Sequence, residues 1–380
     1  MAEILLTIFY ISVLLFFLGS GIWVAISMIG VSSIGMILFT TRPVGDAMAT
    51  TIWGASSSWT LTALPLFVWM GEILFRTKLS KNLFEGLAPW MQRLPGGLIH
   101  VNVVGCALFA AISGSSAATV ATVGKMSIPE LRKRNYPEKI LLGSLAGSGT
   151  LGLLIPPSII LIIYGVTVQE SIAKLFIAGI LPGIMIALIF MTYVIIWSLI
   201  NKKIMPKFSE NFSFFEKIKK SKQLLPVILL IFGVVGSIYT GIATATEAAS
   251  LGVVGALILS YFQKSLNIET FKASLLGATK TSCMIAFILA GATFLSLAMG
   301  FTGLPRNLAI WIQNMDLSPY ILIFVLMVFY IILGMFLDGI SAVVLTMAII
   351  EPMIRQAGFD MIWFGIFLVV VVEMAQITPP

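Results

Sequence analysis

The chain has 380 residues, of which 59% are hydrophobic and only 10% are charged. Soluble domains carry about 25% charged residues, so this composition excludes a soluble protein with an ordinary polar surface. The net charge is +7, from 23 lysine and arginine residues against 16 acidic residues. Because the cations gather in short stretches between apolar runs, this charge indicates membrane topology rather than nucleic-acid binding.

Long uncharged stretches follow one another along the chain. A hydrocarbon core of about 30 Å takes roughly 20 helical residues to cross, whereas strands of membrane barrels are about 10 residues of alternating polarity. The pattern therefore predicts an all-α polytopic membrane protein embedded in the lipid bilayer. The stretches cover residues 4–41, 47–71, 94–124, 140–169, 175–201, 223–246, 248–263, 281–305 and 317–337.

The first stretches already carry topological information. The first cation is Arg42, so residues 1–19 lack the basic start of a cleaved signal peptide and are expected to remain as a first helix.

The stretch 94–124 lies between two segments, 76–93 and 125–139, that each carry a net charge of +3. The positive-inside rule places both segments in the cytoplasm, and 31 residues are too few for two crossings. Residues 94–124 are therefore predicted to form a re-entrant hairpin.

The predicted hairpin tip and the helix after it contain residues that interrupt helices. The tip reads Ser113-Gly114-Ser115-Ser116, and Ile155-Pro156-Pro157 interrupts a helix predicted over 140–165. Irregular backbone at membrane depth must be buried in protein or line a wet cavity. Free carbonyls and serine hydroxyls suit a hard cation such as Na⁺ rather than a transition metal, and half-helix N-termini suit an anionic substrate group. The alternative is that these small residues only allow close helix packing.

A lysine-rich segment, 201–223, divides the chain into halves, 1–200 and 224–380. It contains seven lysines against two glutamates, which predicts a cytoplasmic loop. The second half repeats the landmarks of the first, because Asp338-Gly339-Ile340-Ser341 precedes Thr378-Pro379-Pro380. The two glycine-to-proline spacings, 42 and 40 positions, are similar, and this favours the internal repeat common in secondary transporters.

The second half is predicted to contain an inverted counterpart of the first hairpin, at 320–350. Its flanks, 302–319 and 351–360, are not basic. Counting crossings from the cytoplasmic segment 201–223 places 302–319 on the outer side, so this hairpin would enter from the opposite face. The tip would lie near Asp338, an intramembrane carboxylate that indicates either a functional site or a cap for backbone amides. Crossings are expected at 224–240, 248–263 and 281–301, with a basic cytoplasmic loop at 264–280.

The sequence contains few side chains of the types that usually carry out catalysis. His100 is the only histidine, and Cys106 and Cys283 both fall in apolar runs without a pairing or metal-binding spacing. Gly124-Lys125 does not complete a phosphate-binding loop. No enzyme activity and no transition-metal site are predicted.

The motifs of the chain resemble those of a known family, the large (DctM-type) membrane subunit of the tripartite ATP-independent periplasmic (TRAP) transporters. The resemblance runs over nearly the whole chain. It rests on residues 94–98 (LPGGL), 113–119 (SGSSAAT), 149–152 (GTLG), 155–158 (IPPS), 164–165 (YG), 181–183 (LPG), 241–249 (GIATATEAA), 334–338 (GMFLD) and 378–380 (TPP).

This resemblance implies an ion-transporter-superfamily fold, with two re-entrant hairpins in an inverted repeat and discontinuous helices, which works by an elevator-like movement. It implies a sodium-coupled importer in the bacterial inner membrane with Na⁺ as coupling ion and no organic cofactor. The implied partners are a small four-helix membrane subunit and a periplasmic substrate-binding protein, and the substrates are small organic acids. Alternatives are a stand-alone Na⁺/organic-anion symporter of related fold and, more remotely, a channel or membrane-embedded enzyme.

The resemblance also implies site residues. The first sodium site would combine Ser113 and Ser116 with main-chain oxygens of Gly152, Ile155 and Pro157. The second would use Gly334, Asp338, Gly339 and Thr378. Residues near the substrate would be Ser115, Ser158 and Ser341. By repeat symmetry the second half is expected to be incomplete at its C-terminus, and the 380-residue form is expected to be a truncation that is inactive alone.

Overall fold

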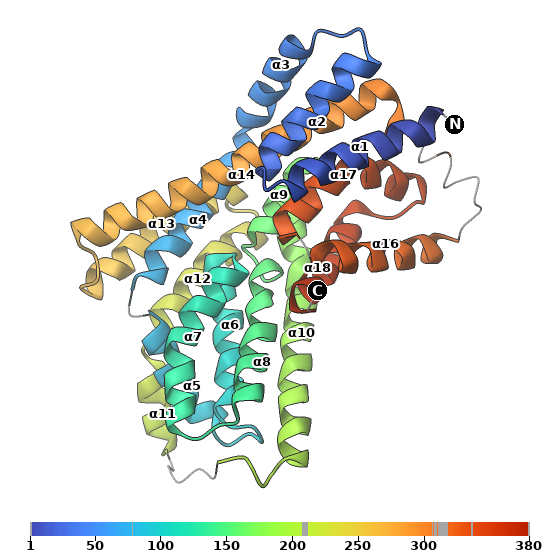
Figure 1. Cartoon of the computed structure of the whole chain (residues 1–380). Coiled ribbons are helices and arrows are strands. Elements are labelled where there is room, and N and C mark those ends of the chain that lie inside the picture. The colour runs from blue at the N-terminus through green and yellow to red at the C-terminus, as the bar shows by residue number, and fades with distance from the viewer. Residues whose placement is uncertain are drawn as a thin grey trace. The chain divides into compact units, whose positions relative to one another are not determined.

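The computed structural model describes residues 2–77, 79–206, 212–305, 307, 310, 318–335 and 337–378. Side chains are described within these ranges except at residues 2–5, 7 and 79–81. The predicted landmark Pro379-Pro380, part of the basic loop and much of the 302–319 flank lie outside the described residues. The described residues form helices and no strand, which confirms the all-α prediction for this part of the chain (Figure 1).

The chain folds into two compact units, each built from several segments. Unit 1 comprises Met1–Thr62, Ile162–Ser171 and Thr281–Pro380, and unit 2 comprises Ala63–Leu161 and Ile172–Lys280. Each unit thus combines residues from both sequence halves.

Unit 1 begins with α1 (Ala2–Gly19), α2 (Val24–Phe39), α3 (Val44–Ser56) and the 3₁₀ turn η1 (Trp59–Thr62). The single apolar stretch 4–41 is therefore two helices, α1 and α2, which pack against each other. Gly21, at φ +77°, lies in the turn that joins them. Met36 of α2 packs against Phe294 and Ala298 in the second part of α14 (Ile268–Thr302).

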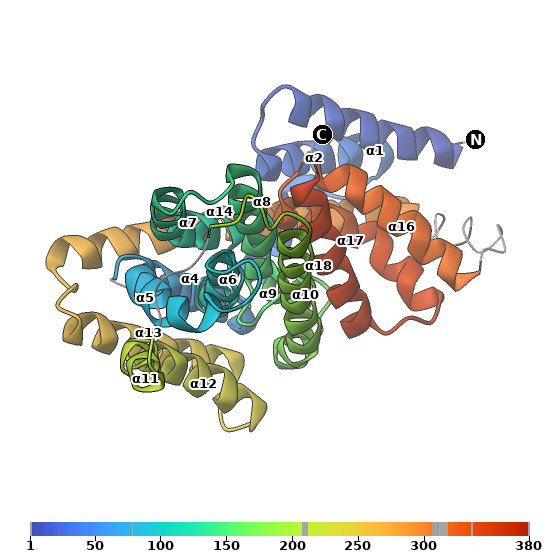
Figure 2. The same ribbon diagram turned by 90° about the horizontal axis from the view of Figure 1, so that it is seen from below.

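The rest of unit 1 consists of α16 (Pro319–Gly334), α17 (Gly339–Gln356) and α18 (Met361–Ile377). All three pack on one another, and Figures 1 and 2 show them together. The end of α9 (Ile159–Thr167) also belongs to this unit.

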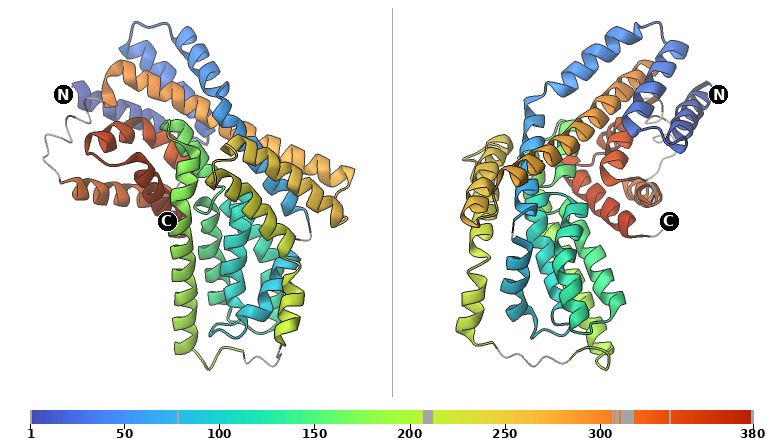
Figure 3. Two further views of the ribbon diagram at one scale, coloured as in Figure 1. Left: turned by 180° about the vertical axis from the view of Figure 1, so that it is seen from behind. Right: turned by 60° about the vertical axis from the view of Figure 1, so that its left-hand side comes forward.

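Unit 2 contains the first hairpin and the helices around it. Its complete elements are α4 (Ala63–Phe75), α5 (Leu79–Met91), α6 (Ile99–Ser113), α7 (Ser116–Lys133), α8 (Glu138–Gly149), η2 (Thr150–Leu153), α10 (Ile172–Ile200), α11 (Phe214–Ser221), α12 (Leu225–Tyr239) and α13 (Ala245–Phe262). The start of α9 and the first part of α14 also belong to unit 2. Helices α6, α7 and α8 pack on one another, and α13 packs on both α4 and α12 (Figure 3).

Four helices of the described chain are long and apolar enough to cross a membrane, namely α10, α13, α14 and α17. Two further pairs of helices, each bent at a short break, pass the same criterion when each pair is taken together. They are residues 44–56 with 59–75, and α11 with α12. The chain therefore has the helices of a multi-pass membrane protein.

The structure differs from the sequence prediction at two helix ends. The predicted loop at 264–280 is wrong from Ile268 onward, because α14 starts there and includes Lys272 and Lys280. Similarly, α7 continues past residue 124 to Lys133. Lysine and arginine are good helix formers whose charged ends reach water while their stems cover apolar surface, so a charge does not end a helix at the edge of the hydrocarbon.

Candidate ion and substrate sites

The first hairpin turns at Gly114 and Ser115, between α6 and α7. Gly114 ends α6 in the left-handed region, at φ +60°, and its N–H donates to the carbonyl of Ala110. The Ser115 side chain accepts from the N–H of Ala118 and so begins α7. Left-handed backbone favours glycine, and serine is a good N-cap, so these two residues explain locally why the helix breaks here.

This tip packs directly on the interrupted segment between α8 and α9. A β-carbon on Gly152 would lie 2.7 Å from the Ser115 carbonyl carbon, and one on Gly114 would lie 2.8 Å from the Pro157 carbonyl oxygen. The N–H of Ile159 donates to the Gly114 carbonyl at 3.4 Å. Two breaks between α-helices, about 40 residues apart in sequence, are thus in backbone-to-backbone contact.

Oxygen atoms gather at this contact. Ser113, only 6% exposed, shares a hydrogen bond of 2.9 Å with the Thr119 hydroxyl. The Ser116 hydroxyl and the carbonyls of Ile155 and Pro157 have no hydrogen bond to any described residue. The structure therefore brings together the backbone around all five residues predicted for the first sodium site.

Thr119 also belongs to this cluster, although no role is predicted for it from the sequence. Its hydroxyl donates to the Ser115 carbonyl at 2.7 Å and also meets Ser113. The sequence spacing could have indicated this contact, because Thr119 lies four residues after Ser115, which is one helical turn. Thr119 holds the shape of the tip.

The two serines of unit 2 expected near the substrate differ in exposure. Ser115 is half-buried at the tip, where it caps α7. Ser158 is fully buried; its hydroxyl donates to the Leu153 carbonyl and accepts from the Leu161 N–H at 3.4 Å. Ser158 therefore stabilises the bend before α9.

The second predicted site lies at the turn between α16 and α17. Asp338 is exposed, and its carboxylate accepts the Ser341 N–H at 3.1 Å, so it caps α17. Of the two interpretations of Asp338, the cap is present in the structure. Gly339 is buried at the start of α17, and Thr378 follows the last residue of α18. A β-carbon on Gly334 would lie 2.6 Å from the Ala375 β-carbon, so the end of α16 meets α18 close to Thr378.

Two polar groups in α17 and α18 are buried without a hydrogen-bond partner among the described residues. They are the Ser341 hydroxyl in α17 and the Glu373 Oε1 atom in α18. Glu373 has no role predicted from the sequence, although it is a carboxylate within an otherwise apolar helix.

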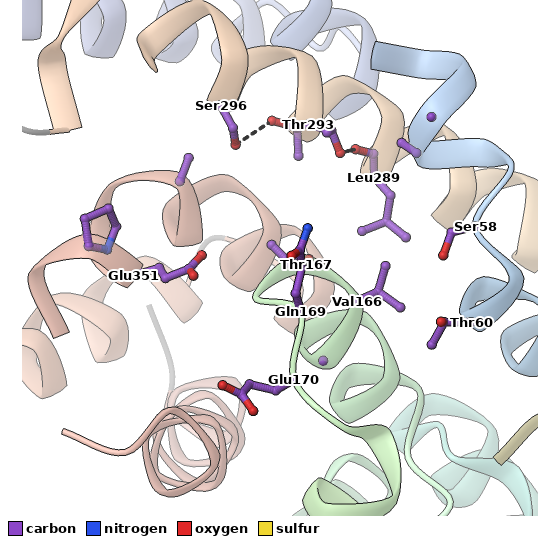
Figure 4. Close-up of a pocket in the computed structure, with 16 residues that line it drawn as sticks. Ser58, Thr60, Val166, Thr167, Gln169, Glu170, Leu289, Thr293, Ser296 and Glu351 are labelled. Atoms are coloured by element: carbon purple, nitrogen blue, oxygen red, sulfur yellow. Dashed lines mark hydrogen bonds between the residues drawn. The ribbon is translucent and has the colours of Figure 1, made fainter. Parts of the chain in front are cut away.

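A cavity of about 630 Å³ lies within unit 1 (Figure 4). Its walls come from the α3–η1 region, the end of α9 with the segment after it, α14 and α17. The hydroxyls of Thr167, Thr293 and Ser296 donate to carbonyls of their own helices, so they offer the cavity acceptor lone pairs. The polar lining residues are Ser58, Thr60, Thr167, Gln169, Glu170, Thr293, Ser296 and Glu351. None of the three serines expected near the substrate lines this cavity.

An ion network joins two walls of the cavity. Arg355 of α17 bonds to Glu351 at 2.9 Å and lies 3.7 Å from Glu170, beyond α9. The same guanidinium donates to the Val168 carbonyl at 3.1 Å. Close by, the Tyr164 hydroxyl donates to the Met361 carbonyl at 2.6 Å. The end of α9 is thus attached to both α17 and the start of α18.

Comparison with known proteins identifies the family. Residues 11–380 match the model of the tripartite ATP-independent periplasmic transporter, DctM component. The C4-dicarboxylate TRAP transporter large permease protein DctM of Pseudomonas aeruginosa is 32% identical over 354 residues, which is 93% of this chain and 82% of that protein. The 2,3-diketo-L-gulonate TRAP transporter large permease protein YiaN of Escherichia coli is 32% identical over 341 residues, 88% of this chain and 78% of that protein.

Two more distant likenesses concern architecture. The isethionate TRAP transporter permease protein DctMQ of Oleidesulfovibrio alaskensis is 30% identical over 96% of this chain, which matches 57% of that longer protein. The structure of MtrF of Neisseria gonorrhoeae, described as representing a class of antimetabolite efflux pumps, superimposes with a TM-score of 0.50 over 87% of this chain and 73% of that one. Its sequence identity is 13%, so it shows the fold alone.

These matches confirm the family predicted from the sequence motifs, and with it a transport component rather than an enzyme. The family and the apolar helices together make the chain a multi-pass membrane protein. The chain therefore belongs to the DctM component family of the tripartite ATP-independent periplasmic transporters.

Proposed function

We propose that this chain is the large permease of a sodium-driven importer of a small organic acid. A periplasmic substrate-binding protein would deliver the acid, and a small four-helix membrane subunit would accompany the permease in the bacterial inner membrane. Support comes from the relatives, whose names include C4-dicarboxylate, isethionate and 2,3-diketo-L-gulonate transporters. The name DctMQ of one relative, of which the chain matches 57%, agrees with a second membrane component.

The observation that carries the sodium proposal is the contact between Gly152 and the Ser115–Ser116 backbone. It brings hydroxyls from one interrupted element beside carbonyls from another, at the point where the α-helices of both elements are broken. A dehydrated Na⁺ needs several hard oxygen ligands from different directions, and two crossing irregular segments supply them. The proposed ligands are the hydroxyls of Ser113 and Ser116 and the carbonyls of Gly152, Ile155 and Pro157.

The second site is proposed at the other hairpin, with Gly334, Asp338, Gly339 and Thr378 around the cation. The close approach of Gly334 to Ala375 supports it, because it brings the end of α16 to the α18 helix that ends beside Thr378. In the proposed cycle, the hairpins and broken helices move as an elevator relative to the outer helices, carrying substrate and Na⁺ together.

Reconstitution tests this function. The permease and its small subunit are placed in proteoliposomes, and uptake of labelled succinate, isethionate and 2,3-diketogulonate is measured with and without an inward Na⁺ gradient and with and without the binding protein. We expect saturable uptake of at least one acid that requires both. Uptake that is unchanged without Na⁺ contradicts sodium coupling, and uptake that persists without the binding protein supports the stand-alone symporter instead. Uptake that does not saturate indicates a channel.

A further inference from the structure

Glu373 is a buried carboxylate in an apolar helix, and the proposed sodium sites do not use it. It lies in α18 and is only 3% exposed. Neither of its oxygens has a hydrogen bond or ion pair with any described residue, and Oε1 is fully enclosed. An ionisable group of this kind within an apolar helix indicates a function rather than a packing role.

Several residues near Glu373 on its own helix are apolar and buried. Val369, one helical turn earlier, is fully buried, as are the nearby Leu368 and Val372. Helix α18 packs against α16 and α17, and its Gly365 packs against Tyr164 of α9. The enclosure is thus made by elements of the same compact unit.

The titratable and charged groups on these neighbouring helices are engaged elsewhere or exposed. Asp338 caps α17, and Glu351 and Arg355 pair with each other. The Tyr330 hydroxyl bonds to Thr346 at 2.5 Å, and the Tyr164 hydroxyl bonds to the Met361 carbonyl. Tyr320, at the start of α16, is 82% exposed. None of these groups provides a positive partner for Glu373.

A charged carboxylate is strongly disfavoured in such a setting unless a cation or several donors accompany it. The neutral acid avoids most of that penalty, so it is the form that this enclosure tolerates. We propose that Glu373 is a proton-binding site, at which a proton adds to the carboxylate before α18 is enclosed and leaves to water when the enclosure opens. The step is a simple protonation of one carboxylate oxygen and needs no other reactant.

This inference deepens the proposed function and, in its transport consequence, rests on it. The enclosed conformation belongs to the unit that holds the second hairpin, so transport has to pass through a state in which Glu373 is neutral. When the enclosure is open to water, raising the pH lowers the fraction of protein in which Glu373 is protonated. For a single group, this fraction falls about tenfold for each pH unit above the pH at which the group is half protonated. Sodium-driven uptake is therefore expected to slow as the pH rises.

The first experiment is independent of transport. Infrared spectra of the permease reconstituted with its small subunit, at pH 7 and without Na⁺, are compared for the natural protein, Glu373→Gln and Glu269→Gln. Glu269 is an exposed carboxylate at the start of α14 and serves as the matched control. We expect the carbonyl band of a protonated carboxylic acid in the natural protein and in Glu269→Gln, but not in Glu373→Gln. A natural protein without this band, or loss of the band on adding Na⁺ at constant pH, overturns the proton assignment.

The second experiment measures the pH profile of Na⁺-driven uptake. Glutamine resembles the neutral acid in shape and cannot ionise, so Glu373→Gln should keep uptake at neutral pH and lose the decline at alkaline pH. Glu373→Asp and Glu269→Gln should keep that decline. An identical alkaline decline in the natural protein and in Glu373→Gln overturns the inference. If the natural protein shows no Na⁺-driven uptake at all, the proposed function fails while the infrared result still decides the protonation of Glu373.

Discussion

Gly152 lies against the peptide backbone of Ser115, so close that a β-carbon on Gly152 would come within 2.7 Å of the Ser115 carbonyl carbon and 2.8 Å of its oxygen. These neighbouring atoms belong to the Ser115 backbone rather than to a flexible side chain, so they cannot move away by a change of rotamer. The hairpin tip and the interrupted segment before α9 can approach this closely only because residue 152 has no side chain.

Gly152→Ala is therefore expected to push the two segments apart. Overpacking of this kind costs about 1–3 kcal/mol, and it should abolish Na⁺-driven uptake if the site depends on the contact. Gly143→Ala, in α8, is the matched control because nothing lies within 4 Å of its would-be β-carbon.

Thermal unfolding of both variants can be followed by reaction of the buried Cys106 with a thiol dye, in a background where the exposed Cys283 is replaced by serine. We expect a lower melting temperature for Gly152→Ala and an unchanged or higher one for Gly143→Ala. Equal melting temperatures and uptake rates for the two variants would contradict the proposed contact.

Ser116→Ala tests the first sodium site with little structural disturbance, because the Ser116 hydroxyl bonds to no described residue. Polar contacts to a charged group are worth about 1.5–3 kcal/mol, so the Na⁺ concentration for half-maximal uptake should rise about tenfold or more. Ser250→Ala is the control, since this exposed hydroxyl bonds only within its own helix, to Thr246. An unchanged Na⁺ dependence in Ser116→Ala would exclude its hydroxyl as a ligand.

The approach of Gly334 to Ala375 predicts a compensating pair. Gly334→Ala should bring two methyl groups to 2.6 Å and lower the free energy of unfolding by about 1–3 kcal/mol. In the double variant Gly334→Ala/Ala375→Gly, the methyl group is on residue 334 instead of residue 375, so much of the lost stability should be recovered. The coupling energy from the double-mutant cycle is the measurement, and purely additive effects would refute the contact.

Arg355 should contribute modestly to the stability of unit 1. Its side chain is 47% exposed, so water screens its ion pairs and Arg355→Gln is expected to cost only about 0.5–1 kcal/mol, less at high salt. The loss should exceed that of Arg132→Gln, because Arg355 joins residues 187 positions apart whereas Arg132 pairs locally with Glu138. Melting temperatures at low and high salt measure both, and a larger loss for Arg132→Gln would disprove this ranking.

Tyr136, in the turn between α7 and α8, links pH to stability. Burial raises the pKa of its phenol above the usual value, although the Leu98 N–H that bonds to its oxygen at 2.9 Å and the charge of Arg134 act in the opposite direction. Because the folded-state pKa is the higher one, the stabilisation is complete below the ordinary tyrosine pKa of about 10 and is lost as the pH rises above it.

Tyr136→Phe removes the acceptor of the buried Leu98 N–H and should cost about 1–3 kcal/mol at neutral pH. It should also weaken the fall in stability above about pH 10. Tyr320→Phe, at an exposed position, should leave both unchanged. Denaturation midpoints measured between neutral and alkaline pH test this prediction. It fails if the midpoint of Tyr136→Phe falls as steeply with pH as that of the natural protein.

Local sequence was informative wherever a residue restricts the backbone at its own position. Gly114 and Ser115 end one helix and begin the next, and Asp338 caps α17, close to where the motifs predicted each turn. Helix ends marked only by charge were less well predicted, as α14 shows, because lysine is compatible with a helix that continues into water.

The sequence by itself determined that the chain is a helical membrane protein and which motifs assign it to its family. It also determined the breaks that glycine, serine and proline make near residues 114 and 156. These properties follow from composition and from the conformational limits of glycine, proline and capping residues. Only the tertiary structure decided that Gly152 touches Ser115 and that Glu373 is enclosed without a partner among the described residues. Such contacts join residues distant in sequence, and burial depends on what packs around a side chain, which no local pattern specifies.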